Sequence, residues 1–250
     1  MHAYLDYNGL LAFAHRGGAE EAPENTMAAF EAAVRLGYRY LETDGYTTSD
    51  GVLLSFHDQI LDRVTDMQGA VAETSWDVMK KAKVEGKEPV PLMAEVLDAF
   101  PETRINIDPK VDSAVEPLIK LIRDMDVLDR VCIGSFSSER IDAFRDAFGA
   151  KVCTSMGPGE TARLRGHAYN LPLKPLLANC AQIPVKQYGL TLVDPRMVRA
   201  ANRLGLQIHV WTIDEEDEME RLIDLGVHGL MTDKPSLLRE VLKRRGLWGD

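Results

Sequence analysis

A stretch near the N-terminus gathers the residue types that carry out acid–base and metal chemistry. Two histidines, His15 and His57, enclose a pair of carboxylates, Glu42 and Asp44. Side chains two residues apart point to the same face of a strand, so we expect Glu42 and Asp44 to share a cation. Arg16 follows the first histidine and adds a positive charge. These groups together indicate a metal-assisted site for an anionic substrate.

A third carboxylate completes the predicted cation site. Asp108 ends a predicted strand over 104–108, and functional groups collect at the carboxyl ends of barrel strands. Oxygen ligands alone favour a hard cation, so we expect Mg²⁺ or Ca²⁺, with Mn²⁺ as an alternative, rather than zinc. Lys110 lies two residues further on and joins Arg16 as a cation suited to phosphate oxygens.

The two histidines are suited to proton transfer, because imidazole has a reference pKa of about 6.5. Cleavage of a phosphodiester needs one group that activates the nucleophile and another that protonates the leaving oxygen. We predict that His15 and His57 are this catalytic pair, with the acid and base roles left open between them. The remaining histidines lack this context and are interpreted as structural or surface groups: His2, His167, His209 and His228.

Alternating strand and helix patterns must position these side chains. The predicted strands cover residues 10–14, 38–44, 52–56, 104–108, 131–134, 151–154, 181–185, 207–212 and 228–231, with a short added strand at 190–193. Most are followed by a helical pattern, and composition does not change along the chain. We therefore predict one domain over residues 1–250, an α/β fold of the (β/α)₈ TIM-barrel type. A doubly wound open sheet is the alternative, although its usual glycine-rich phosphate turn is missing after the first strand.

Two local features refine this prediction. Residues 58–90 are polar and irregular, with a helix expected near 76–83, and we interpret them as a short insertion after the second strand of the barrel. Asn25 precedes a helical pattern and is a plausible N-cap for the first helix.

Composition excludes several classes of protein. The chain has 29 Lys and Arg against 39 Asp and Glu, a formal net charge of −10, which argues against general nucleic-acid binding. No apolar run approaches the ~20 residues of a membrane span, and no signal peptide is recognisable, so we expect a cytoplasmic protein. Cys132, Cys153 and Cys180 are widely spaced without a CxxC pattern. They predict neither a disulfide framework nor a zinc site, and we interpret them as reduced core thiols.

A series of short motifs, in order over nearly the whole chain, resembles the glycerophosphodiester phosphodiesterase family. The motifs are His15-Arg16-Gly17, Pro23-Glu24-Asn25-Thr26, Glu42-x-Asp44, Asp50-Gly51, His57-Asp58, Asn106-Ile107-Asp108-Pro109-Lys110, Val210-Trp211-Thr212, and Gly226-Val227-His228-Gly229 with Thr232-Asp233-Lys234-Pro235. Each motif is weak alone, but the ordered set is specific. The resemblance implies a TIM barrel with a short insertion after strand two. It also implies cation-dependent hydrolysis of glycerophosphodiesters to sn-glycerol 3-phosphate and an alcohol, a reaction of lipid and glycerol metabolism.

The resemblance also assigns roles to single residues. It implies His15 and His57 as the catalytic pair, Glu42, Asp44 and Asp108 as metal ligands, Arg16 and Lys110 as phosphate-contacting cations, Trp211 and Phe136 as pocket residues, and Glu24 as a carboxylate that orients a catalytic imidazole. The chain departs from the family at Asp108-Pro109, where a glutamate and an apolar residue are usual. The shorter side chain affects the choice of metal and its affinity.

Two other functions remain as alternatives. A lyase that stops at a cyclic phosphate occurs in the related phospholipase D toxins, but those proteins are secreted and disulfide-bonded, and this chain shows neither sign. A catalytically silent barrel that only binds glycerophosphoryl ligands would not need an acid–base pair. The expected partner is a small-molecule glycerophosphodiester, with the alcohol group and the oligomeric state left open.

Overall fold

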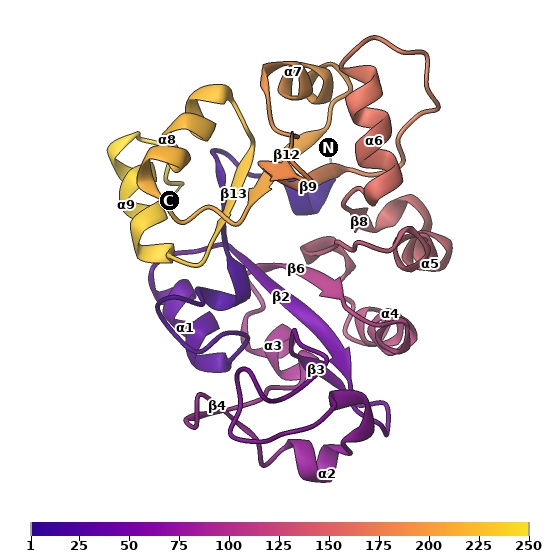
Figure 1. The fold of residues 1–250 in the computed structure, drawn as a ribbon, viewed down its shortest axis with the longest axis vertical. Helices are drawn as coiled ribbons and strands as arrows, with labels where there is room; N and C mark the ends of the chain where they lie inside the picture. The colour runs from indigo at the N-terminus through magenta and orange to yellow at the C-terminus, as the bar shows by residue number, and fades with distance from the viewer. Residues whose placement is uncertain (1, 250) are drawn as a thin grey trace.

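A barrel of parallel strands organises the molecule (Figure 1). Within residues 2–249, which this computed structural model describes, eight parallel strands follow the order β8-β7-β6-β2-β1-β13-β12-β9. They are β1 (Leu11–Ala14), β2 (Tyr40–Thr47), β6 (Arg104–Pro109), β7 (Val131–Ile133), β8 (Cys153–Thr154), β9 (Cys180–Pro184), β12 (Gln207–Trp211) and β13 (Gly229–Thr232). An isolated parallel bridge between Ser155 and Cys180 closes the ring between β8 and β9. The predicted TIM barrel is therefore confirmed, and the doubly wound sheet is wrong.

Helices cover the outside of the barrel between successive strands (Figure 1). They are α1 (Met27–Arg35), α3 (Met93–Ala99), α4 (Val115–Asp124), α5 (Ser138–Phe148), α6 (Pro158–His167), α7 (Pro195–Arg203), α8 (Glu216–Leu225) and α9 (Pro235–Arg244). Each turns an apolar face inward; α4, for example, buries Leu118, Ile119 and Ile122. The strands and helices of the barrel lie where the sequence predicted them, with bounds that differ by a few residues.

The first helix begins one residue later than expected. Thr26 caps α1, and its Oγ1 accepts a hydrogen bond from the backbone N–H of Ala29 at 3.3 Å. Asn25 instead has a φ of 56° and turns its side chain to Asp44 and Thr43. The prediction of Asn25 as the N-cap is wrong, because its amide is held by the polar groups of β2.

An insertion between the barrel strands β2 and β6 forms a small layer of its own. Strand β3 (Leu53–Ser55) folds back and pairs antiparallel with the far end of β2, so it is not a barrel strand. The chain then forms α2 (Trp76–Met79) and the hairpin of β4 (Lys83–Val84) and β5 (Glu88–Pro89), at the lower end of the view in Figure 1. The apolar residues beneath this layer are Tyr46, Leu54, Phe56, Leu61, Val71, Met79, Ala82, Val84 and Val90. The expected helix near 76–83 is thus shorter than predicted.

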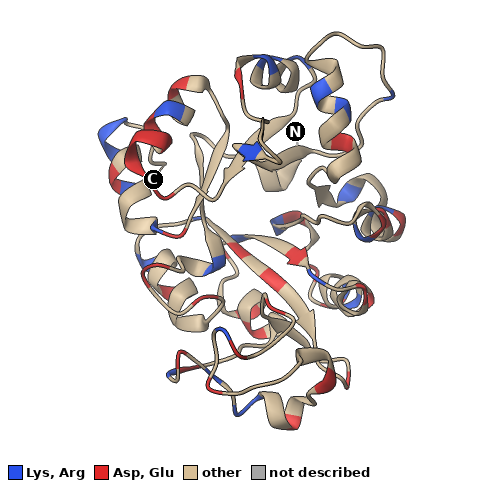
Figure 2. Ribbon diagram, viewed as in Figure 1, with Lys and Arg blue, Asp and Glu red and all other residues tan. Residues whose placement is uncertain are grey.

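Strand β2 is longer than predicted and changes the position of the acidic pair. Glu42 and Asp44 lie within this strand rather than at its end, because β2 continues to Thr47, where it pairs with β3. In the register with β6, Asp44 is opposite Asp108. Figure 2 shows acidic positions on β2 and β6 in the middle of the ribbon, among strands that are otherwise largely uncharged.

The helices of residues 2–249 are short. None of them combines the length and the apolar character that crossing a bilayer requires.

Candidate functional site

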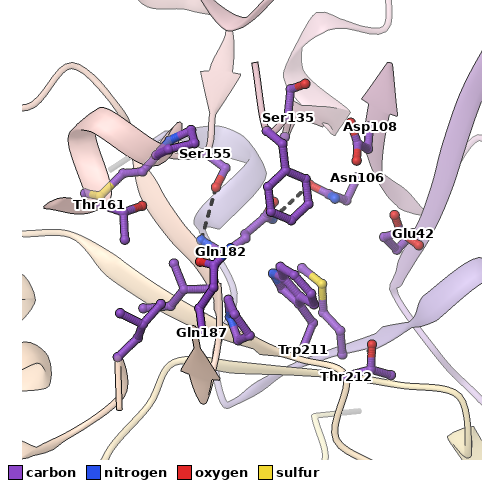
Figure 3. Close-up of a pocket in the computed structure, with 18 of the residues that line it drawn as sticks. Glu42, Asn106, Asp108, Ser135, Ser155, Thr161, Gln182, Gln187, Trp211 and Thr212 are labelled. Carbon is purple, nitrogen blue, oxygen red and sulfur yellow. Dashed lines mark hydrogen bonds between the residues drawn. The ribbon is translucent and has the colours of Figure 1, made fainter. Parts of the chain in front are cut away.

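A cavity of about 510 Å³ opens beside the carboxyl ends of the barrel strands. It is lined by nine of the predicted site residues: His15, Arg16, Glu42, Asp44, His57, Asp108, Lys110, Phe136 and Trp211. Figure 3 shows Glu42 and Asp108 on one side of this cavity and Thr161 and Gln187 on the other, with Gln182 and Trp211 between them. Residues far apart in the chain therefore share one pocket, as expected for a TIM barrel.

The acidic side of the cavity is built on β2 and β6. Glu42 accepts a hydrogen bond from the backbone N–H of Arg16 at 3.0 Å, and Asp44 accepts one from the side-chain amide of Asn25 at 3.0 Å. The Nζ atom of Lys110 lies 3.0 Å from Asp44 Oδ1 and 2.8 Å from Asp108 Oδ2. The Nε atom of Arg16 lies 3.2 Å from Asp44 Oδ2, so these contacts gather three carboxylates and two cations into one network.

The two carboxylates of β2 have opposite protonation behaviour. Burial and the neighbouring Asp44 charge raise the pKa of Glu42 to about 7. Burial also opposes ionisation of Asp44, but the charges of Lys110 and Arg16 outweigh it and lower the pKa of Asp44 to about 2. Near neutral pH Glu42 is therefore partly protonated, and a cation bound beside it would favour its ionised form.

The donor chemistry of this wall fits a hard divalent cation. Glu42 and Asp44 share one face of β2, and Asp108 stands beside Asp44 on the next strand. In the described part of the chain, carboxylate oxygens from the three residues do not all come within 4.8 Å of one another. Asp108 instead bonds to Lys110, which competes for the same oxygens that a cation would use. Glu42 and Asp44 would thus be better placed than Asp108 to contact such a cation.

His15 is held between two carboxylates from other parts of the barrel. Its Nδ1 lies 2.7 Å from Asp233 Oδ1, and its Nε2 lies 3.8 Å from Glu42 Oε2. Burial lowers the pKa of an imidazole, but the Glu42 charge and the Asp233 hydrogen bond outweigh burial and raise the pKa of His15. Asp233 therefore orients this histidine and, together with the larger effect of Glu42, raises its pKa.

The Asp233→Asn variant tests this arrangement. Removal of the carboxylate withdraws a partner that favours the protonated imidazole, so we expect the pKa of His15 to fall. An NMR titration of the histidine resonances measures this change. The His57 resonance is the internal control, because its partner is a different residue. An unchanged His15 titration would show that Asp233 does not tune this imidazole.

His57 has its own carboxylate partner in the next residue. Its Nδ1 lies 2.5 Å from Asp58 Oδ1, and Arg63 binds both oxygens of Asp58. Burial opposes ionisation of Asp58, but hydrogen bonds from Arg63 and His57 outweigh it and lower the pKa of Asp58. Because both histidines engage a carboxylate through Nδ1, each has Nε2 available for proton transfer.

Glu24 contacts two arginines rather than a histidine. Its carboxylate bonds to Arg63 at 2.7 and 2.9 Å and to Arg16 at 3.0 Å, and it does not line the cavity. The carboxylates that contact the imidazoles are Asp58 and Asp233, so Glu24 can influence their orientation only through other residues. Glu24 acts through Arg63, which in turn holds Asp58.

Other polar residues of the cavity had no predicted role. Gln182 donates from its side-chain amide to Asn106 Oδ1 at 2.8 Å and from its backbone N–H to Ser155 Oγ at 3.0 Å (Figure 3). Asn106 lies two residues before Asp108 in β6, so both side chains point to the same face of the strand. This spacing could have predicted that Asn106 lines the cavity. Gln182 comes from β9 and carried no local signal of its role.

Much of the remaining lining of the cavity is apolar. The Phe136 and Trp211 rings meet edge to face, with centroids 5.7 Å apart. Phe136 is 58% exposed, which is unusual for a phenylalanine and leaves one face of its ring open to a ligand. Further apolar lining comes from Met156, Ile183, Leu190 and Leu192. The pocket therefore combines a charged half with an apolar half.

Known proteins resemble this chain over nearly its whole length. The model of the Glycerophosphoryl diester phosphodiesterase family matches residues 15–237. The chain is 38% identical over 252 residues to the "Probable glycerophosphodiester phosphodiesterase 2" of Mycobacterium tuberculosis, covering 98% of this chain and 95% of that protein. It is 31% identical to a lysophospholipase D of Rattus norvegicus, and the match covers 91% of this chain and 84% of that protein.

Solved structures share the same fold. A phosphodiesterase of Oleispira antarctica, determined in complex with the product sn-glycerol-3-phosphate, is 18% identical with a TM-score of 0.80, and the match covers 97% of this chain and 100% of that one. A glycerophosphodiester phosphodiesterase from Agrobacterium tumefaciens is 22% identical with a TM-score of 0.77, covering 94% and 99%.

Proposed function

Because the chain belongs to the Glycerophosphoryl diester phosphodiesterase family, we propose that it hydrolyses glycerophosphodiesters to sn-glycerol 3-phosphate and an alcohol. One observation supports this most directly. His15 and His57 each engage a carboxylate through Nδ1 and face the same cavity as the acidic pair of β2 and two cationic side chains. This combination suits proton transfer to and from a phosphodiester.

We propose that Glu42, Asp44 and Asp108 hold one divalent cation, Mg²⁺ or Ca²⁺, with Mn²⁺ as an alternative. Such an ion supplies electrostatic stabilisation of a phosphoryl oxygen when it is bound. The oxygen-only donor set and the two buried carboxylates that face one cavity support this assignment. Lys110 now contacts both Asp44 and Asp108. When the cation is bound, Lys110 gives up some of these contacts and binds the substrate phosphate.

The proposed reaction divides the work among the side chains of the cavity. Arg16 and Lys110 bind the phosphate oxygens and stabilise the charge that grows on them. One histidine removes a proton from the attacking hydroxyl, which belongs to water or to the glycerol of the substrate. The other donates a proton to the departing alkoxide, and the Asp partners at Nδ1 keep each Nε2 directed to the cavity.

A coupled assay for glycerol 3-phosphate tests the proposed function. The panel contains glycerophosphodiesters of choline, ethanolamine, glycerol and inositol, each with Mg²⁺, Ca²⁺ or Mn²⁺. Release of glycerol 3-phosphate with at least one diester supports the proposal. Phosphorus NMR of the product separates hydrolysis from a lyase reaction, because only the lyase accumulates a cyclic phosphate. Binding without turnover would favour the silent barrel.

The raised pKa of Glu42 predicts a pH-dependent cation affinity. The pKa is about 7 in the folded protein against an ordinary 4.5, and the cation binds the ionised carboxylate. Affinity is therefore full above this pKa and falls by up to about tenfold per pH unit below it. Calorimetric titration with Ca²⁺ at several pH values measures the effect, and Glu42→Gln is the control in which this dependence is lost. Equal affinity on both sides of neutral pH would contradict the assignment.

A second candidate substrate is a lysophospholipid. The rat relative is named a lysophospholipase D, and the apolar side of this cavity offers a surface for an acyl chain. We expect Phe136→Ala to reduce kcat/KM for lysophosphatidylcholine about tenfold, the loss of about 1.4 kcal/mol of apolar contact. The same variant leaves glycerophosphocholine almost unaffected, since that substrate has no chain to place there. Equal losses for both substrates would exclude this role of Phe136.

A further inference from the structure

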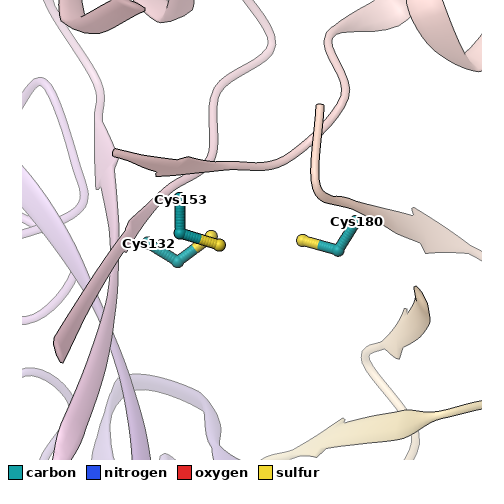
Figure 4. A group of neighbouring side chains, drawn as sticks. All are labelled: Cys132, Cys153 and Cys180. Carbon is teal, nitrogen blue, oxygen red and sulfur yellow. The ribbon is translucent and has the colours of Figure 1, made fainter. Parts of the chain in front are cut away.

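A second cluster of chemically reactive side chains lies at the other end of the barrel. Cys153 and Cys180 are the first residues of β8 and β9, and Cys132 lies in β7, paired in register with Cys153. Their three Sγ atoms lie within 4.8 Å of one another and are buried. Figure 4 shows the sulfurs of Cys132 and Cys153 turned toward the sulfur of Cys180. The barrel has thus gathered thiols that are widely separated in the sequence.

Two buried polar atoms beside these thiols have no hydrogen-bond partner among the described residues. They are the hydroxyl of Tyr4 and Nδ1 of His209, and both residues are fully buried. Burial and the three nearby thiols raise the pKa of Tyr4, while interactions with Cys132, Cys153 and then His209 lower the pKa of Cys180. An unpaired buried polar atom destabilises a folded protein, so two of them around one cluster indicate a missing ligand.

The tautomer of His209 can be read from its neighbours. The amide nitrogen of Gln207 donates to the backbone carbonyl of Leu5 at 3.2 Å, which directs its oxygen to His209 Nε2 at 3.0 Å. Nε2 therefore carries the proton, and Nδ1 presents a lone pair. A neutral imidazole whose outer N–H is held by an amide oxygen is the form that binds metal ions.

We propose that Cys132, Cys153, Cys180 and Nδ1 of His209 bind one Zn²⁺ ion in a closed tetrahedral site. Zinc–thiolate bonds of about 2.3 Å place tetrahedral sulfurs about 3.8 Å apart, so the three sulfurs need only a small contraction. The His209 imidazole lies outside the group of three sulfurs that are within 4.8 Å of one another, and it completes the site by moving toward them. Binding releases three thiol protons, and the Tyr4 hydroxyl donates to one of the resulting thiolates.

The position of the cluster gives the ion a structural role. Strand β8 has two residues, and its contact with β9 is the single bridge between Ser155 and Cys180. Cys180 is itself part of this bridge on β9, and Cys153 lies on β8, two residues before Ser155. A bound Zn²⁺ would join β7, β8, β9 and β12 where the ring of strands is least hydrogen-bonded. The ion would therefore stabilise the barrel and take no part in the reaction at the opposite end.

Titration of the reduced, metal-free protein with Co²⁺ tests the proposal. Thiolate–cobalt charge-transfer absorption reports sulfur ligands, and the carboxylates of the catalytic cavity cannot produce it. We expect this absorption to saturate at one equivalent and to disappear when Zn²⁺ is added. The signal should remain in Asp44→Asn, in which only the carboxylate site is changed. Zn²⁺ should also raise the melting temperature of the wild-type protein.

Substitutions within the cluster locate the ion. Cys180→Ala should lose at least nine-tenths of the charge-transfer absorption and the zinc-dependent rise in melting temperature. Met231→Leu is the matched control, because Met231 is buried in the same apolar cluster and has no thiolate. His209→Gln should keep the sulfur signal and shift the cobalt ligand-field bands. If the wild-type protein with three reduced thiols shows no charge-transfer band, or if Cys180→Ala retains it, the proposal is wrong. The wild-type titration decides the matter even where a variant does not fold.

Discussion

In the His57→Ala protein, release of glycerol 3-phosphate falls by about 10²–10⁴-fold, the contribution expected of one well-placed acid or base. The His15→Ala protein shows a loss of similar size. The physical reason is that each imidazole has Nδ1 occupied by an aspartate and faces the cavity with Nε2. Neither side chain contributes much apolar burial, so circular dichroism and the melting temperature should remain close to those of the wild type. The coupled assay under saturating substrate and cation measures kcat.

The control for these variants is His167→Ala. This histidine lies on α6 outside the cavity, so its replacement tests the effect of losing an imidazole elsewhere. Asp58→Asn should give a smaller loss than His57→Ala, because it disturbs the orientation of His57 without removing it. Near-normal kcat in either His15→Ala or His57→Ala would remove that residue from the catalytic pair.

Chelation of divalent cations by EDTA should abolish turnover, and added Mg²⁺, Ca²⁺ or Mn²⁺ should restore it. Asp44→Asn should reproduce the loss without recovery and lower kcat/KM by about 10³-fold, which corresponds to the several kcal/mol that a bound cation supplies. Asp44 is the informative position because its low pKa, about 2, keeps it ionised at every working pH. Its carboxylate is also buried, so a solvent-exposed acid elsewhere on the protein cannot take its place.

The matched control for this experiment is Asp77→Asn on α2, an exposed acid far from the cavity lining. It changes the net charge by the same amount and should leave kcat/KM unchanged. Full activity of the wild-type protein after exhaustive chelation would contradict the proposed cation. If the activity of Asp44→Asn recovers at high cation concentration, Asp44 affects only the affinity for the cation.

Much of the fold followed from local patterns. The alternation of strands and helices is a property of short windows of sequence, so it predicted the barrel and most of its elements. Predictions were less accurate where tertiary contacts compete with local preference. β2 runs past the barrel edge because β3 pairs with it, and Asn25 gives up capping because Asp44 and Thr43 bind its amide.

The candidate site shows the same division. His15, Glu42, Asp44 and His57 stood out because their types and spacing are unusual within one short stretch. The partner of His15 did not stand out, since Asp233 is 218 residues away and only closure of the barrel brings β13 beside β1. The contact between Glu24 and Arg63 was not predictable for the same reason, because Arg63 lies in the insertion and reaches Glu24 only after folding.

The sequence by itself determined the periodic burial of the strands, the chemistry of the acidic pair and the two histidines near it. The tertiary structure alone decided which charged side chains are in contact, and these contacts determine which groups are protonated. It also decided that Cys132, Cys153 and Cys180, which have no metal-binding spacing in the chain, come within 4.8 Å of one another. The reason is that side-chain periodicity acts over a few residues, whereas the ring of parallel strands sets contacts between segments that are far apart in the chain.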